Sequence, residues 1–134
     1  MGALLYYARA VDNNFLVALS TISGQQAEAN KKTNEAINQI LDYCATYPND
    51  GIVYISSDMI LCAHSDDGFH NERRGRSRAG AHMFLAEDEP IPKWNGPVLT
   101  IAQIMKFVIA SASEANLGPM FITAQDMVSQ QNNL

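Results

Sequence analysis

Residues 52–64 have the sequence Ile-Val-Tyr-Ile-Ser-Ser-Asp-Met-Ile-Leu-Cys-Ala-His. The β-branched and aromatic run at 52–55 and the apolar run at 59–64 are typical of strands, and the polar residues between them favour a turn. These two runs therefore predict a β-hairpin. A third strand is predicted at Ala81–Leu85, after a polar and arginine-rich loop that begins at Ser65.

Helical patterns occupy the residues before this β region. Apolar residues recur at helical spacing in Gly2–Val11, around Phe15–Ile22 and, most regularly, in Gln25–Thr46. A turn-forming stretch then ends the last of these helices. The sequence therefore predicts a helical segment over residues 1–50 and a β-rich segment over residues 51–134.

A closing helix is predicted near the C-terminus, because six apolar residues follow helical spacing there and trace one helical face. They are Leu117, Met120, Phe121, Ala124, Met127 and Val128. Residues 97–101 stay open, since they fit a buried strand as well as the start of a helix. Helices, a three- or four-stranded sheet and a final helix together give an α+β fold class.

The composition is that of a compact domain and not of a disordered chain. Of the 134 residues 47% are hydrophobic and 17% are charged, and the net charge is −5. Such an acidic protein does not attract nucleic acid by its overall charge. Four clustered arginines are the exception, and they form either a solvated loop or a patch that contacts phosphates. They are Arg73, Arg74, Arg76 and Arg78.

Several features favour a soluble protein inside the cell. No run approaches the roughly 18 apolar residues needed to span a bilayer, and no signal-peptide pattern opens the chain. Cys44 and Cys62 are too few and too far apart for a disulfide framework or a zinc site, so we expect buried free thiols. The three histidines do not form a site by their spacing. We therefore expect an intracellular protein without membrane contact.

Three stretches of the chain share their order and spacing with one known family. They are Gly2–Asp12 with its continuation through Asn34–Tyr47, His64–Asp66 with Arg76–Gly80, and Ser111–Gly118. The first resembles the helical connection ahead of the ribonuclease H domain in copia-type (LTR) retrotransposon polyproteins. The second resembles the first two strands of that domain, and the third resembles the start of its first long helix.

This resemblance implies a mixed, five-stranded sheet flanked by helices, and hydrolysis of the RNA strand of an RNA–DNA hybrid. In the family, two Mg²⁺ ions held by several converging carboxylates support that reaction. Residues 1–50 then correspond to the connection segment, and residues 51–134 correspond to part of the ribonuclease H-like domain.

By the same resemblance, Asp66 matches the first-strand aspartate and Glu114 matches the helix glutamate, so both are implied catalytic residues and Mg²⁺ ligands. The remaining acids of the family would follow residue 134, so we expect an incomplete set that holds Mg²⁺ weakly or not at all. Asp67 is either a substitute ligand or part of an exposed turn. Pro119 lies in the matching helix, which either continues through it or restarts near Gly118.

A sheet shortened in this way leaves the strand with Met59, Ile60, Leu61 and Cys62 at its edge. An uncharged edge with unpaired backbone groups pairs readily with another chain, so we expect a homodimer. Ile52–Ile55 or the N-terminal helices could cover the edge instead. The expected function is that of a retroelement-derived, catalytically incomplete domain that binds itself, a protein or a nucleic acid such as an RNA–DNA hybrid. Residual metal-dependent ribonuclease H activity is the alternative.

Overall fold

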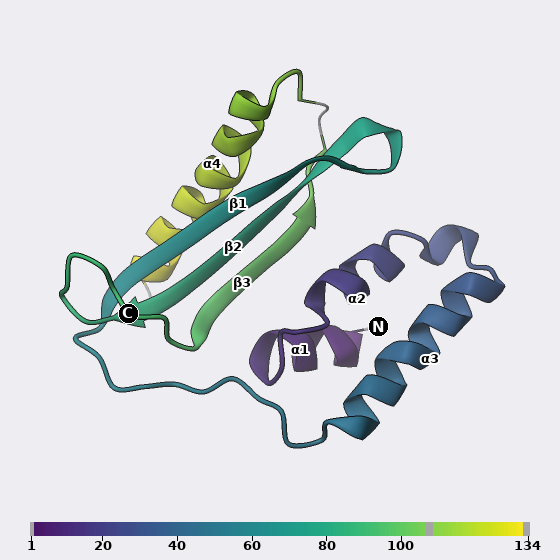
Figure 1. Ribbon diagram of the computed structural model, residues 1–134, viewed down its shortest axis with the longest axis horizontal. Coiled ribbons are helices and arrows are strands. Elements are labelled where there is room, and N and C mark those ends of the chain that lie inside the picture. The colour runs from purple at the N-terminus through teal and green to yellow at the C-terminus, as the bar shows by residue number, and fades with distance from the viewer. Residues whose placement is uncertain (1, 107–108, 133–134) are drawn as a thin grey trace. The chain divides into compact units, whose positions relative to one another are not determined.

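The computed structural model describes residues 2–106 and 109–132 of the chain, apart from the side chain of Arg73. The chain divides into two compact units, one up to Ile52 and one from Val53 onward. In the part described, the first unit contains only helices, and the second contains a sheet and one long helix (Figure 1). The predicted α+β class is therefore confirmed.

The first unit has three α-helices, which are α1 (Gly2–Ala10), α2 (Leu16–Ser23) and α3 (Lys31–Thr46), and a short 3₁₀ turn η1 (Gln26–Glu28). Helix α3 begins later than predicted, because Asn30 caps it. The backbone N–H of Thr33 donates to the side-chain oxygen of Asn30 over 3.2 Å. The backbone N–H of Asn30 donates in turn to the Thr33 hydroxyl over 3.3 Å, which completes a capping box.

The second unit is built on a three-stranded sheet in the order β1–β2–β3, with β1 at Ile60–Glu72, β2 at Arg76–Ala86 and β3 at Pro97–Ile104. Helix α4 (Ala112–Gln131) follows it. Both strand pairings are antiparallel. The sheet formed by the described residues is thus antiparallel throughout, where the resemblance implies a mixed one. Residues 97–104 form a strand, which decides the stretch that periodicity left open.

The predicted hairpin between residues 52–55 and 59–64 does not form, and residues 53–58 carry no strand. The backbone N–H of Ile55 donates to the Asn95 side-chain oxygen over 2.7 Å, and the Asn95 amide donates back to the Ile55 carbonyl over 2.8 Å. The Tyr54 hydroxyl donates to the carbonyl of Pro97 over 3.0 Å. Side-chain contacts therefore hold this segment, and one asparagine satisfies both polar backbone groups of Ile55.

The hairpin that does form joins β1 to β2. The stretch after Ser65, predicted as a loop, is mostly strand, and its register places Asp66 opposite Gly80. The turn is the 3₁₀ segment η2 (Arg73–Gly75). Gly75 adopts a φ of 66°, a left-handed conformation that a residue without a Cβ adopts at little cost.

Helix α4 packs along one face of the sheet, mainly against β1 (Figure 1). A core cluster combines Ala81, Met83 and Ile101 of the strands with Leu61, Ala63, Leu99 and the α4 residues Ile122 and Met127. Pro119 lies inside α4 and is buried, and the helix continues through it without restarting near Gly118. The predicted apolar face of this helix exists as a stripe, but Leu117, Met120, Phe121 and Val128 are exposed.

Candidate functional site

The two aspartates of β1 lie on opposite faces of the sheet. Leu61 and Ala63 pack on the side of α4, and the register of β1 is regular from Ile60 to Gly68. Because side chains alternate along a strand, Asp67 faces α4 and Asp66 faces away from it. The Asp66 side chain is exposed, and its Oδ1 accepts a hydrogen bond of 2.9 Å from the backbone N–H of Asp67.

The Asp67 side chain is half-buried. Its Oδ2 atom is buried and has no hydrogen-bond partner among the described residues. A buried polar atom left in this way costs about 1–3 kcal/mol, so native structures seldom retain one without a reason. Asp67 is therefore not part of an exposed turn, which was one of the two interpretations of its sequence context.

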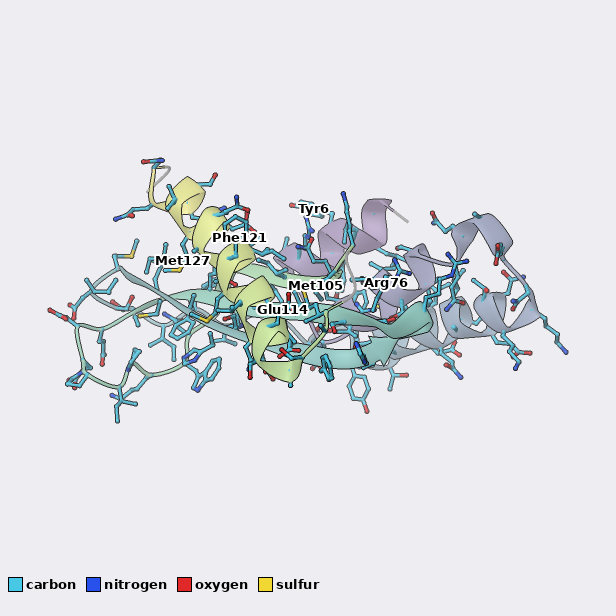
Figure 2. All side chains as sticks on the ribbon, turned by 90° about the horizontal axis from the view of Figure 1, so that it is seen from above. Tyr6, Arg76, Met105, Glu114, Phe121 and Met127 are labelled. Atoms are coloured by element: carbon cyan, nitrogen blue, oxygen red, sulfur yellow. The ribbon has the colours of Figure 1, made fainter. Side chains whose placement is uncertain are left out.

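Glu114 lies in the first turn of α4 and acts there as part of the helix cap (Figure 2). The Ser111 hydroxyl accepts a hydrogen bond of 3.2 Å from the backbone N–H of Glu114. The Glu114 carboxylate in turn accepts one of 3.1 Å from the backbone N–H of Ala110. A negative charge here also interacts favourably with the positive end of the helix dipole.

Asp66 and Glu114 do not converge on one metal centre. Such a centre needs several carboxylates that converge on one point, whereas Asp66 lies on the face away from the helix that carries Glu114. No three His, Cys, Asp or Glu side chains in residues 2–106 and 109–132 gather closely enough to hold a metal ion.

The four clustered arginines occupy different environments. Arg78 is buried, and its Nε lies 2.6 Å from a carboxylate oxygen of Glu72. Arg74 is exposed in the η2 turn with a φ of 63°, and Arg76 is half-buried at the start of β2. The side chain of Arg73 lies outside the described residues. Arg78 therefore stabilises the hairpin itself, and among the three arginine side chains that the structure describes, Arg74 is the exposed one.

An aromatic cluster covers part of the sheet face opposite α4, and the sequence spacing did not reveal it. His64 and His82 are register partners on β1 and β2, and both rings lie beside Phe84 and Trp94. The His64 and Trp94 ring centroids are 4.4 Å apart with an interplanar angle of 22°. The sequence signal for this cluster is that His64, His82 and Phe84 occupy even-numbered positions of β1 and β2, which lie on one face. Recognising it requires the strand register, which the sequence alone does not give.

The N-terminal half of β1 forms an uncharged sheet edge. Among the described residues, only β2 pairs with β1, so its outer side has no strand neighbour. Residues 60–65 carry no acidic or basic side chain apart from His64, while Asp66 and Asp67 follow directly. The pairing with β2 becomes irregular between Gly68 and Glu72. The first half of the edge is therefore the part best suited to accept another strand.

The residues that were expected to mediate pairing differ in exposure. Met59 and Ile60 are exposed, whereas Leu61 packs on the core cluster beneath α4. Cys62 is half-buried and free, as is Cys44 in the first unit.

Across the described helices, none is long and apolar enough to cross a membrane. No family model, curated protein or solved structure matches the chain.

Proposed function

We propose that the chain is a retroelement-derived, ribonuclease H-like domain that acts inside the cell by association, and that its partner is a second copy of itself. The observation that carries the proposal is the uncharged edge of β1 from Ile60 to Ser65. The family part of the proposal draws support from element order. The three resembling stretches fall on α1 and α3, on the β1–β2 hairpin, and on the start of α4.

Edge pairing gives partners to the outward-facing backbone groups in the first half of β1, from Ile60 to Ser65. Two β1 strands related by a two-fold axis run antiparallel, and their pairing joins two three-stranded sheets into one continuous sheet. The contact is confined to the first half of β1, because charged side chains on an edge strand disfavour pairing and Asp66 and Asp67 follow directly. Met59 and Ile60, which are exposed in one copy, would become covered in the pair.

Salt separates this association from binding to nucleic acid. Each copy has a net charge of −5, so added salt screens the repulsion between copies and does not weaken their pairing. Binding of phosphates through Arg74 and its neighbours would instead weaken steeply with salt, because it depends on counterion release.

The test is the molar mass in solution, measured by light scattering at several concentrations and two salt concentrations. The natural chain should have the mass of a dimer at low concentration. At the same low concentration Ile60→Lys should give a monomer, because a lysine on an edge strand disfavours pairing. Val98→Lys makes the same kind of change on β3, at the opposite edge, and should leave the dimer intact; the exposed fractions are 44% for Ile60 and 38% for Val98. A monomeric natural chain at every concentration would overturn the proposal.

Residual metal-dependent ribonuclease H activity is the second candidate, and the position of Asp67 favours it. This carboxylate faces α4, the helix that carries Glu114, and keeps one buried oxygen without a partner. If it replaces Asp66 as a ligand, cleavage of a labelled RNA–DNA hybrid with Mg²⁺ or Mn²⁺ should be lost in Asp67→Asn and in Glu114→Gln. Asp66→Asn is the matched control and should retain cleavage. Equal loss in Asp66→Asn, or no cleavage by the natural chain, would remove this candidate.

A further inference from the structure

The outer face of α4 carries an apolar stripe that the sheet does not cover. We define the outer stripe as Leu117, Phe121, Ala124 and Val128. All four are exposed, with exposed fractions of 62% for Leu117, 64% for Phe121 and 62% for Val128 (Phe121 is labelled on α4 in Figure 2).

Helix α4 therefore has apolar residues on two sides. Its inner side buries Ala115, Pro119 and Thr123, and Ile122 packs on the core clusters of the sheet. A surface helix in water normally has one apolar face, and a helix that is apolar all round is normally buried on all sides. The outer stripe is thus a surface that favours a partner.

We propose that the outer stripe binds the outer stripe of a second copy, as an antiparallel pair of α4 helices. This is a second association surface, separate from the β1 edge. The stripe residues are spaced by four, three and four positions. Alternating steps of three and four are the spacing at which two helices keep one seam in contact along their length.

The order of large and small residues selects the antiparallel arrangement. With the two-fold axis between Ile122 and Thr123, Phe121 of one copy lies opposite Ala124 of the other, and Leu117 lies opposite Val128. The large ring then fills the space beside a small residue, which allows the helices to approach to about 8–10 Å. A parallel pair would instead set Phe121 against Phe121 and leave a gap between the two Ala124 residues.

The charges of α4 also favour a second copy over other partners. Its sequence contains two charged residues, Glu114 and Asp126, and neither belongs to the outer stripe. No like charges therefore meet across the pair. Helices that lie on membrane surfaces carry lysine and arginine on their polar face, and α4 has neither.

The pair should be weaker than a permanent dimer. With one four-residue stripe from each copy, we expect the pair to bury less than about 1,200 Å² of surface in total. Interfaces of that size are typical of weak and transient complexes. We therefore expect association through α4 only at higher protein concentration, where it would join the dimers that form through β1. Phe121 has the largest side chain of the outer stripe, and aromatic residues often dominate small interfaces.

The test uses Ile60→Lys as the starting chain, so that the β1 edge does not contribute, and measures self-association by sedimentation over a wide concentration series. Adding Leu117→Lys should weaken the association by about tenfold or more. Adding Val128→Glu to that variant should restore it, because each new lysine then lies opposite a new glutamate of the partner. The two residues are eleven positions apart, roughly 16 Å along the helix, so this ion pair cannot form within one copy.

Two further measurements make the result decisive. Ile91→Gln removes an exposed apolar residue outside α4 and should leave the association unchanged. Far-ultraviolet circular dichroism checks that every variant keeps its helices. Failure of Val128→Glu to restore the association, or an Ile60→Lys chain that stays monomeric throughout, would overturn the α4 pair. If the single variant Leu117→Lys of the natural chain lost the dimer and the single variant Ile60→Lys kept it, the β1 edge would be rejected and the α4 pair retained.

Discussion

The guanidinium Nε of Arg78 lies 2.6 Å from a carboxylate oxygen of Glu72, and this ion pair joins β2 to the end of β1. Both side chains are largely removed from solvent. The pair stands where the register of the β1–β2 hairpin is irregular, between Gly68 and Glu72. It therefore stabilises the part of the hairpin that regular backbone pairing supports least.

Removal of Arg78 should destabilise the second unit strongly. In Arg78→Ala the Glu72 carboxylate stays shielded from water without its partner, and breaking a buried pair in this way costs about 3 kcal/mol. Arg74→Ala, in the exposed turn of the same hairpin, should change the free energy of unfolding by less than about 0.5 kcal/mol. Urea denaturation followed by the fluorescence of Trp94, which is the one tryptophan of the chain, measures both. Equal effects would show that the ion pair does not stabilise the hairpin.

The two neighbouring aspartates of β1 should respond differently to substitution. Asp67→Ala removes a buried oxygen that has no partner in the described residues, so it should raise the free energy of unfolding by about 1 kcal/mol. Asp66→Ala alters an exposed side chain and should change it by less than about 0.5 kcal/mol. A clear loss of stability in Asp67→Ala would mean that its carboxylate is satisfied in solution.

Local sequence signals predicted the helices well, because their apolar periodicity and their caps lie within a few residues of each other. The two short helices and α3 of the first unit appear where periodicity placed them, with the start of α3 moved to the Asn30 cap. The β region was predicted less well. Residues 52–55 have strand-like composition, but Asn95, forty residues away, binds Ile55, and local composition carries no trace of such a contact.

The candidate site depended on strand register, which a single sequence does not specify. Asp66 and Asp67 differ by one position, and that one position sends their side chains to opposite faces of the sheet. The sequence also did not predict which face of α4 packs on the sheet. Its buried positions are occupied by Ala115, Pro119 and Thr123, while the larger Leu117 and Phe121 are exposed, so size and hydrophobicity pointed to the wrong side.

The aromatic cluster on the face opposite α4 should depend on Phe84. This side chain is fully buried, and its ring lies 5.6 Å from both His64 and Trp94. Phe84→Ala should lower the free energy of unfolding by about 3–5 kcal/mol, as in other cores. His64→Ala removes an exposed ring and two stacked pairs, each worth about 0.5–1.5 kcal/mol. Trp94 emission should shift to longer wavelength in the folded Phe84→Ala chain, and an unshifted spectrum would contradict the cluster.

The first unit contains a buried carboxylate, that of Asp12 between α1 and α2, whose partner is Tyr43 of helix α3. The backbone N–H of Asn14 donates to Asp12 Oδ1 over 3.0 Å, and the Tyr43 hydroxyl donates to Asp12 Oδ2 over 3.2 Å. A hydrogen bond from the Asn14 amide lowers the pKa of Tyr43. Burial, the hydrogen bond to Asp12, and the charges of Asp12 and Asp50 outweigh it, so the pKa is raised above 10.0.

This raised pKa predicts how stability depends on pH. The folded chain favours the neutral phenol of Tyr43, so its contribution to stability is fully present below pH 10.0 and is lost as the pH rises through the higher pKa of the folded state. Above pH 10.0, the natural chain should lose stability more steeply than Tyr43→Phe as the pH rises. Tyr6→Phe, which changes an exposed tyrosine of α1, should keep the pH dependence of the natural chain. Parallel curves for the natural chain and Tyr43→Phe would show that the hydroxyl of Tyr43 does not bind Asp12 in solution.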